Sequence, residues 1–242
     1  MGLINWVKNF SSNTLYYPGC LTKGILKQEF ENYKTIFNKL GIDYIMLPND
    51  EVCCGLPVLN AGYKKDARKL AEKNFETFKK FNVKKIITNC PSCYHTFKEI
   101  YPQLIRNWNI ETEHATVAIF NEIKKRGIKI KEKEFVSYHD PCHLGRYSKI
   151  YEQPRKVIEA LGGKILEMKY NRENALCCGG GGGIRANFPD IAKNIAKKRV
   201  ENLSGHVVKI ISPCALCYLN LKTATDKSEE FSDFVLRKLE WK

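Results

Sequence analysis

Short apolar segments alternate with longer amphipathic segments along the first half of the chain. The runs at residues 14–17, 44–47 and 85–88 are short and apolar, and they predict strands. Residues 24–40 and 61–81 carry apolar side chains three and four positions apart, which predicts helices with one buried face. This alternation is typical of a parallel α/β sheet covered by helices.

The same alternation returns in the second half of the chain. The strands predicted there are 135–138, 164–167 and 207–211, and the helices are 151–161 and 188–203, with a further helix at 116–125 between the halves. We therefore expect two α/β domains, residues 1–110 and 135–242, joined by a connecting segment at 111–134. Two similar halves also predict a pseudo-twofold axis between them.

All ten cysteines belong to one pattern that occurs once in each half. The pattern is a single cysteine, a Cys-Cys-Gly triplet and a Cys-x-x-Cys motif. The single cysteine precedes the triplet by 32 intervening residues in the first half and by 34 in the second, and 35 residues separate the cysteine pair from the Cys-x-x-Cys in both. We expect one five-thiolate site in each half, at Cys20, Cys53, Cys54, Cys90 and Cys93 and at Cys142, Cys177, Cys178, Cys214 and Cys217.

Three kinds of chemistry use cysteine clusters of this kind. Structural zinc is tetrahedral and takes four ligands, so a fifth cysteine and an adjacent pair fit it poorly. Disulfides need an oxidising compartment, and five cysteines leave one thiol unpaired in each half. Iron–sulfur clusters usually take four thiolates, but a cluster with several irons can accept a fifth sulfur as a bridge. The pattern favours iron–sulfur clusters, with zinc and disulfides as alternatives.

The local sequences around these cysteines resemble a known family. They include YHDPCHLGR at 138–146, CCGGGGG at 177–183 and the full C-x32-CC-x35-CxxC arrangement, in which glycine is the first of the 35 residues. The chain is similar to the paired CCG (cysteine-rich) domains of the catalytic subunit of heterodisulfide reductase, in both its separate and its fused form. That resemblance implies two noncubane [4Fe-4S] clusters held by the ten cysteines, and an oxidoreductase subunit that reduces a small disulfide between them.

Other residues near the cysteines are candidates for a role in the site. By the same resemblance, His143 is the catalytic candidate, because it can protonate a released thiolate; His139 and His95 are weaker candidates. Arg146 and Arg185 either bind an anionic substrate group or, as we favour, pair with neighbouring acids. The glycines at 179–183 predict a backbone that approaches the cluster closely and offers it N–H donors.

The chain has no ferredoxin-type Cys-x2-Cys-x2-Cys-x3-Cys-Pro run and no flavin or nicotinamide fingerprint. We therefore expect a partner that supplies electrons, either a ferredoxin-type iron–sulfur subunit or a flavoprotein subunit. One alternative is an electron-transfer subunit of a flavin-dependent 2-hydroxyacid or succinate/fumarate oxidoreductase. Another is a zinc-stabilised scaffold, which would be redox-silent.

Composition and charge restrict the kinds of partner and the compartment that the sequence predicts. The net charge is +14, and basic runs such as 197–199 are expected on solvated helix faces, although a positive field would also attract an acidic partner. No motif indicates nucleic-acid binding. No apolar run is long enough for a transmembrane segment, and the first ten residues lack the pattern of a signal peptide. Ten ligand-like cysteines without an export signal predict a cytoplasmic protein.

Overall fold

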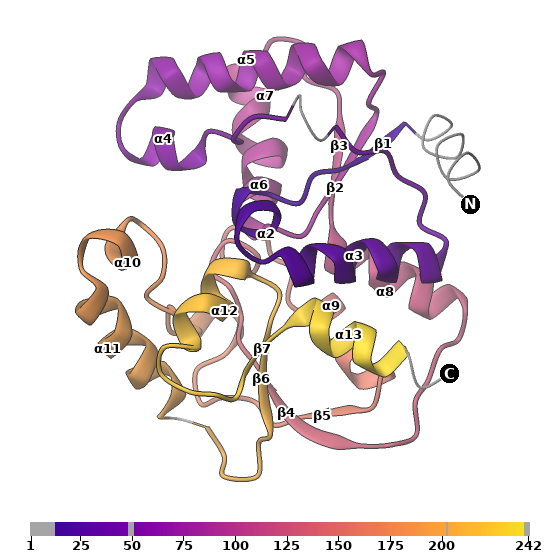
Figure 1. The fold of residues 1–242 in the computed structure, drawn as a ribbon, viewed down its shortest axis with the longest axis vertical. Coiled ribbons are helices and arrows are strands. Elements are labelled where there is room, and N and C mark those ends of the chain that lie inside the picture. Colours follow the sequence, from indigo (N-terminus) through magenta and orange to yellow (C-terminus); the bar gives the residue numbers. More distant parts are fainter. Residues whose placement is uncertain (1–12, 48–50, 202, 240–242) are drawn as a thin grey trace.

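The computed structural model describes residues 13–47, 51–201 and 203–239. The chain forms two α/β lobes, each built on a parallel sheet (Figure 1). The first sheet has the order β1-β2-β3, with strands Thr14–Tyr16, Lys85–Thr88 and Glu111–His114. The second has the order β5-β4-β6-β7, with strands Gly163–Ile165, Glu134–Tyr138, Lys209–Ser212 and Ser228–Glu230. The predicted fold class, two repeats with small parallel sheets flanked by helices, is confirmed.

Helices follow the strands in both lobes. Those of the first lobe are α2 (Cys20–Gly24), α3 (Lys27–Leu40), α4 (Leu56–Asn60), α5 (Lys64–Lys80), α6 (Pro91–His95), a π-helical turn at Thr96–Ile100, α7 (Tyr101–Leu104) and α8 (Ala115–Lys125). Those of the second are α9 (Glu152–Ala160), α10 (Ile184–Asn187), α11 (Pro189–Val200), α12 (Ala215–Leu221) and α13 (Phe231–Leu239), with a short 3-10 turn at Arg172–Asn174.

The strand predicted at 44–47 is reduced to a single parallel bridge, between Ile45 and Leu15. Ile45 and Leu47 are buried in the core of the first lobe, whereas Tyr44 and Met46 pack against a second core. The segment is therefore extended, as its alternation indicates, but its backbone pairs with β1 only around Ile45.

Two strands were not predicted, and both are polar. β3 (Glu-Thr-Glu-His) joins the edge of the first sheet beside β2. There Nζ of Lys85 on β2 forms ion pairs with the carboxylates of Glu111, at 3.1 Å, and Glu113, at 2.8 Å. β7 (Ser-Glu-Glu) occupies the corresponding edge of the second sheet. In each lobe a helix follows directly, α8 after β3 and α13 after β7. The start of the predicted connecting segment thus forms the last strand and helix of the first repeat.

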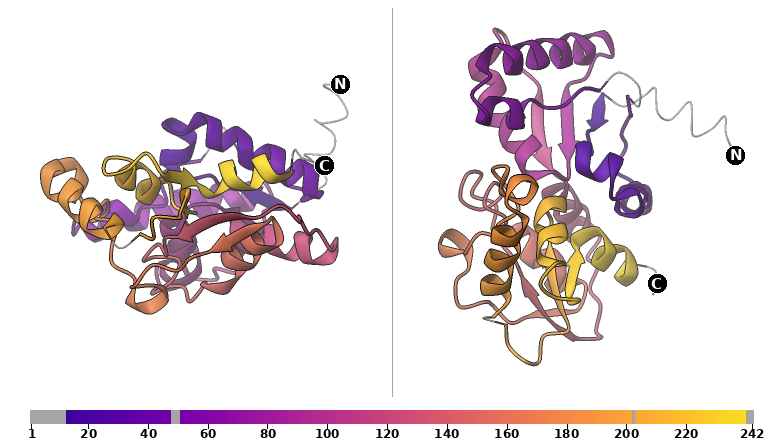
Figure 2. Two further views of the ribbon diagram at one scale, coloured as in Figure 1. Left: turned by 90° about the horizontal axis from the view of Figure 1, so that it is seen from below. Right: turned by 60° about the vertical axis from the view of Figure 1, so that its left-hand side comes forward.

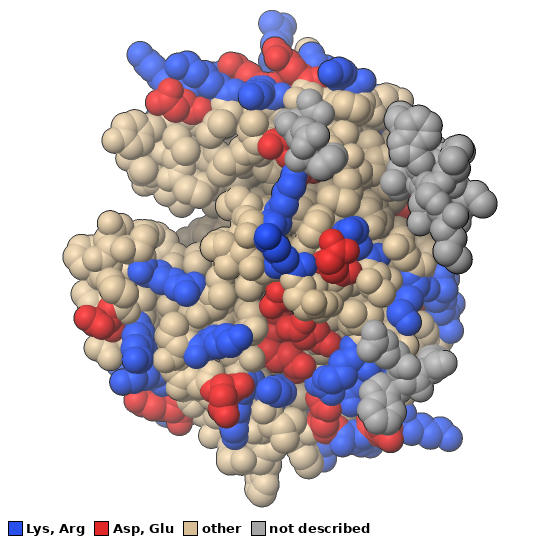
Figure 3. Space-filling model, in the orientation of Figure 1, with Lys and Arg blue, Asp and Glu red and all other residues tan. Residues whose placement is uncertain are grey.

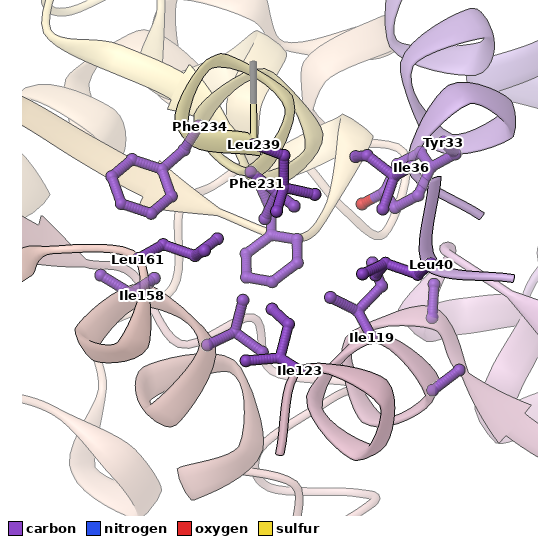
Figure 4. Packing of buried hydrophobic residues seen from close by; sticks show 14 of the residues in the cluster. Tyr33, Ile36, Leu40, Ile119, Ile123, Ile158, Leu161, Phe231, Phe234 and Leu239 are labelled. Carbon is purple, nitrogen blue, oxygen red and sulfur yellow. The ribbon is translucent and has the colours of Figure 1, made fainter. Parts of the chain in front are cut away.

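The two lobes share one hydrophobic core, made by four helices. α3 of the first lobe packs against α13 of the second, and α8 of the first packs against α9 of the second. The buried side chains at this contact include Ile119, Ile158 and Phe231 (Figure 4). Each lobe contributes one helix from the early part and one from the end of its repeat, which is the exchange expected across a pseudo-twofold axis. The stacked lobes are seen from the side in Figure 2.

A buried carboxyl group joins the lobes beside this core. Glu230 accepts hydrogen bonds from Tyr33 Oη of α3 (2.9 Å) and from the Ser232 backbone N–H (2.6 Å). Asn32 of α3 also donates to Asp233 of α13, at 2.6 Å. Burial, reinforced by the charge of Asp233, raises the pKa of Glu230 to about 8, and burial raises that of Asp233 to about 6.

We expect Ile119→Ala to lower the free energy of unfolding by about 2–5 kcal/mol, because it opens a cavity in the shared core. Urea denaturation measures this, and the exposed Ile191→Ala should change it by less than about 0.5 kcal/mol. Both lobes should unfold in one transition, since they share the core. Two separate transitions in the parent protein would contradict the shared core.

We also expect the contribution of Glu230 to stability to fall as the pH rises from about 5 to about 8. The folded pKa of Glu230 is raised above its ordinary value of 4.5, so the protonated carboxyl favours the folded state below 4.5, and this contribution is lost as the pH rises through about 8. The loss is at most about 1.4 kcal/mol per pH unit. Glu230→Gln should remove this contribution from the pH dependence of urea midpoints. The contributions of Asp233 and Glu51, which have the same sign, should remain. Those of His114 and His139, which have the opposite sign, should remain as well. An unchanged pH profile in that variant would contradict the assignment.

Candidate metal centres

The cysteines lie in loops and first helical turns on the side of the carboxyl ends of the strands, where ligands collect in parallel α/β sheets. Cys20 opens α2 shortly after β1, and Cys90 stands just before α6 after β2. Cys142 and Cys214 occupy the corresponding places after β4 and β6. All ten cysteines are free thiols.

The thiols of the first half form a continuous series of hydrogen bonds. Cys20 bonds to Cys53, Cys53 to Cys54, Cys54 to Cys93 and Cys93 to Cys90. Hydrogen bonds from Cys20 and then from Cys54 lower the pKa of Cys53 to about 2, whereas the bond to Cys53 raises the pKa of Cys54 to about 12. The hydrogen bond with Cys93 also lowers the pKa of Cys90. The structure therefore brings the five predicted sulfurs of this half together, with Cys53 and Cys90 as the preferred thiolates.

The second half repeats the series in the same order. Cys142 bonds to Cys177, Cys177 to Cys178, Cys178 to Cys217 and Cys217 to Cys214. Hydrogen bonds from Cys142 and then from Cys178 lower the pKa of Cys177 to about 2. In each half the second cysteine of the vicinal pair is buried, while Cys20 and Cys177 are exposed and open their sites to solvent.

A glycine in the left-handed region follows each vicinal pair. Gly55 has φ +87° and Gly179 φ +84°, values that other residues rarely adopt. Each donates its backbone N–H to the first sulfur of its pair, Cys53 or Cys177, at 3.4 Å. A side chain at Gly179 would also place its Cβ 2.7 Å from Cβ of Ile195. The turn thus needs glycine for both its backbone conformation and its packing.

Only the first part of the predicted glycine loop lies against a cysteine. Gly179 and Gly180 donate to Cys177 and Cys178, the second at 3.3 Å. A Cβ added at Gly181 or Gly182 would meet no atom within 4 Å. A side chain at either position would therefore point into open space, and the loop continues from these two glycines into α10.

A buried asparagine holds the vicinal pair in each half, and neither was predicted from the sequence. Asn74 donates to the carbonyl of Cys53 at 3.1 Å, and Asn220 donates to the carbonyl of Cys178 at 2.6 Å. Neither lies near a cysteine of its pair in the sequence. Their role depends on the packing of α5 and α12, so no local pattern could have identified them.

Two apolar contacts bring the sites of the two lobes to their common interface. Leu21, next to Cys20, packs in a cluster with Ala215, next to Cys214. Leu144, close to Cys142, packs in a cluster with Tyr94, next to Cys93. Each contact pairs the first cysteine loop of one lobe with the Cys-x-x-Cys helix of the other. Both sites therefore border the same junction between the lobes.

His143 lies at this junction. Its Nδ1 is 3.5 Å from Sγ of Cys142, and its ring centroid is 5.9 Å from that of His95 and 5.0 Å from that of Tyr147. Burial, followed by the charge of His95, lowers the pKa of His143, against the influence of Cys177. His95, from the first lobe, has a buried Nδ1 with no hydrogen-bond partner in the part of the chain that is described.

The two predicted arginines do not pair with acids in the described part of the chain. Arg146 donates to the carbonyl of Ala175 at 2.6 Å, and no ion pair joins Arg185 to a described carboxylate. The expectation of acid partners for them is therefore wrong within these residues. Arg199 was expected on a solvated face, yet it is fully buried beside His139.

The surface is hollowed between the part of the first lobe that carries α4 and the part of the second that carries α10 (Figure 3). In this view the walls of the hollow show few charged side chains, and most Lys and Arg lie on the outer faces. A hollow with few charged side chains suits a ligand that carries little charge at its centre.

The donor set fits an iron–sulfur cluster. Each half offers five soft sulfur ligands, one more than tetrahedral zinc takes, and backbone N–H groups donate to sulfurs of the vicinal pairs. The deeper sulfurs, such as those of Cys93 and Cys217, belong to residues that are 3% and 4% exposed, so a cluster here would be largely shielded from water. No helix in the described ranges has the length and apolar character required to cross a bilayer.

A family profile described as "Cysteine-rich domain" (CCG) matches residues 14–98 and again residues 136–222. A subunit of the dihydromethanophenazine:CoB–CoM heterodisulfide reductase from Methanosarcina acetivorans is 36% identical over 225 residues, which cover 89% of this chain and 54% of that protein. EtfAB:quinone oxidoreductase from Syntrophomonas wolfei is 35% identical over 70% of this chain and 24% of its own length. A subunit of the fumarate reductase (CoM/CoB) from Methanothermobacter marburgensis is 29% identical over 91% of this chain and 44% of its own length.

The chain thus spans about half the length, or less, of these relatives. A solved structure, glutamate racemase from Aquifex pyrophilus, matches with a TM-score of 0.36 at 14% identity over 94% of this chain and 82% of its own, a likeness too low to support an argument.

We expect Asn220→Ala to destabilise the protein by about 1–3 kcal/mol, because it leaves the buried carbonyl of Cys178 without its donor. Thermal unfolding measures the loss. The matched change at the surface, Asn187→Ala, removes an exposed bond to the carbonyl of Gly183 and should have little effect. Equal effects of the two variants would show that Asn220 does not hold the pair.

Proposed function

Because the chain belongs to the CCG cysteine-rich domain family, we propose that it is an iron–sulfur oxidoreductase subunit of the heterodisulfide-reductase type. In this proposal the ten cysteines hold two noncubane [4Fe-4S] clusters, one in each lobe. The observation that carries it is the repeated five-thiol series, placed on both sides of one junction. A disulfide that enters the hollow between the lobes would reach both sites.

The overall reaction consumes two electrons and two protons, and it converts one disulfide into two thiols. When bound, the clusters supply the electrons, one from each lobe. The residues of the chain position the disulfide and handle the protons. His143 lies at the junction, partly buried and next to Cys142, where its ring can hold a proton and pass it to a departing thiolate.

The electrons must come from outside this chain, whose ten cysteines are all assigned to the two sites. A ferredoxin-type iron–sulfur subunit or a flavoprotein subunit is the proposed donor. The net charge of +14, with many Lys and Arg on the outer faces in Figure 3, suits an acidic partner.

A second candidate function is electron transfer without disulfide chemistry. It is favoured by the relatives named as EtfAB:quinone oxidoreductase and as a fumarate reductase subunit. In that case the clusters would pass electrons to a redox centre of a partner, and a small disulfide would not be a substrate. A zinc-stabilised scaffold remains the alternative outside redox chemistry.

The first test is the content of iron and acid-labile sulfide in protein prepared without oxygen. We expect about eight iron atoms and a similar amount of sulfide per chain, with EPR signals on oxidation or reduction. Zinc without labile sulfide, under conditions that reconstitute a control iron–sulfur protein, would overturn the redox proposal. Oxidation of a reduced viologen dye by added disulfides then separates the two redox functions, since an electron-transfer subunit should not catalyse it.

His143→Gln should lower the rate of disulfide reduction by about 10²–10⁴-fold, because the released thiolate loses its proton donor. Iron content and EPR spectra should remain those of the parent protein. His206→Gln, at an exposed position, is the matched control and should keep the full rate. A full rate in His143→Gln would remove the residue from the proton transfer.

A further inference from the structure

The second site contains a buried guanidinium group that has no carboxylate partner among the described residues. Arg199, on α11, is 0% exposed, and no ion pair joins it to an acid within those ranges. Its Nε donates to Nδ1 of His139 at 3.1 Å and its Nη1 to the carbonyl of Tyr170 at 2.8 Å. Its Nη2 is buried and has no partner among the atoms described. A buried charge of this kind is costly unless an anion compensates it.

The geometry fixes the tautomer of His139. Arginine nitrogens only donate, so Nδ1 of His139 must accept, and the ring proton must lie on Nε2. This Nε2 is buried and has no hydrogen-bond partner in the described part of the chain. A nitrogen that carries a proton cannot ligate a metal. His139 is therefore a hydrogen-bond donor and not a sixth ligand.

His139 borders the cysteine site, and Arg199 lies behind it. A ring nitrogen of His139 and the sulfurs of Cys178 and Cys217 all lie within 4.8 Å of one another. Cys217 and Cys178 also act electrostatically on Arg199, in the direction that raises its pKa.

The nearby carboxylate makes no direct contact with Arg199. Asp140 accepts from both terminal nitrogens of Arg155, at 2.7 and 2.8 Å, and from the backbone of Arg172 at 2.9 Å. Its charge favours the charged form of Arg199 from a distance, and the sulfur site is a second source of negative charge.

The first site lacks this pair. Tyr17 occupies the position in the first repeat that His139 occupies in the second, three residues before the first cysteine. The backbone N–H of Tyr17 donates to the carbonyl of Ile87, and that of His139 donates to the carbonyl of Ile211. The hydroxyl of Tyr17 donates to the carbonyl of Val52 at 2.5 Å and is thus satisfied. The residue of the first repeat that corresponds to Arg199 is Phe75, since it follows Cys54 at the same separation as Arg199 follows Cys178. The two five-thiol sets are alike, but among the described residues a buried arginine of this kind accompanies only the second.

We propose that His139 and Arg199 donate hydrogen bonds and positive charge to the cluster of the second lobe and hold its reduction potential above that of the first. This inference rests on the proposed function, since it requires a cluster in each lobe. Reduction adds negative charge to a cluster, and N–H donors and a cation at its sulfurs stabilise the reduced form. Burial strengthens the effect, because little water screens the charge. The second cluster is then reduced first, and electrons pass from the first lobe to the second.

The test is an EPR-monitored redox titration of anaerobically loaded protein. Arg199→Met should lower the ratio of reduced to oxidised second cluster at least tenfold at the midpoint potential of the parent, equivalent to about 59 mV for a one-electron couple. Arg199→Lys, which keeps the charge, should retain most of the potential. The first cluster should not shift in either variant. The double variant Cys54→Ser/Cys93→Ser, which breaks the first site, assigns the second signal.

A matched control separates buried charge from surface charge. Lys197→Met removes one positive charge from an exposed position on the same helix and should leave both potentials unchanged. An equal shift in Lys197→Met and Arg199→Met, or no shift in Arg199→Met, would overturn the proposal.

A second pair of variants covers the case in which Arg199→Met fails to fold or load. His139→Gln keeps an N–H donor near the position of Nε2, whereas His139→Leu removes it, so the second cluster should have the lower potential in His139→Leu. Equal potentials in the two variants would overturn the role of the donor. If the parent protein holds no iron and sulfide, the proposed function fails; if it is fully loaded and the potentials do not move, only this inference fails.

Discussion

The packing of α3 against α13 and of α8 against α9 is the contact on which the rest of the structure depends. Each lobe is a small sheet with helices, and the largest hydrophobic cluster draws its side chains from both. This contact also fixes the distance between the two cysteine sites, since the same junction carries the clusters around Leu21 and Leu144. If the lobes separated, each site would lose one wall. The stability of the fold and the geometry of the candidate centre therefore have the same physical origin.

The repeat is symmetric in its sulfur ligands and asymmetric in their surroundings. Both halves use the same order of thiol contacts, a left-handed glycine after the vicinal pair and a buried asparagine that holds it. The residues around them differ, with a satisfied tyrosine at the first site and a histidine–arginine pair at the second. A duplicated scaffold can in this way hold two similar centres with different electrostatic environments, as a protein that divides a two-electron reaction into one-electron steps requires.

The strands that were not predicted are those whose side chains are polar. β3 and β7 carry glutamates at sheet edges, where ion pairs with Lys85 and Arg237 and hydrogen bonds to Tyr33 and Ser232 satisfy them. Hydrophobic periodicity cannot detect such strands, because their stability comes from neighbours distant in sequence. The same limit explains why 44–47, with its clear alternation, forms only one bridge: its side chains divide between two cores.

The repeat, the α/β class and the grouping of the ten cysteines could all be predicted, because covalent spacing and apolar periodicity are local properties of the chain. The polar residues that accompany the sulfurs could not, because they come together only through packing. Arg199 belongs to a basic run that is typical of a solvated helix face, and its burial follows from how α11 packs on its lobe. Asn74 and Asn220 likewise meet the vicinal cysteines only after their helices have docked. The ligands could be recognised in the sequence because their pattern is repeated, whereas their electrostatic environment arises from contacts that exist only in the folded chain.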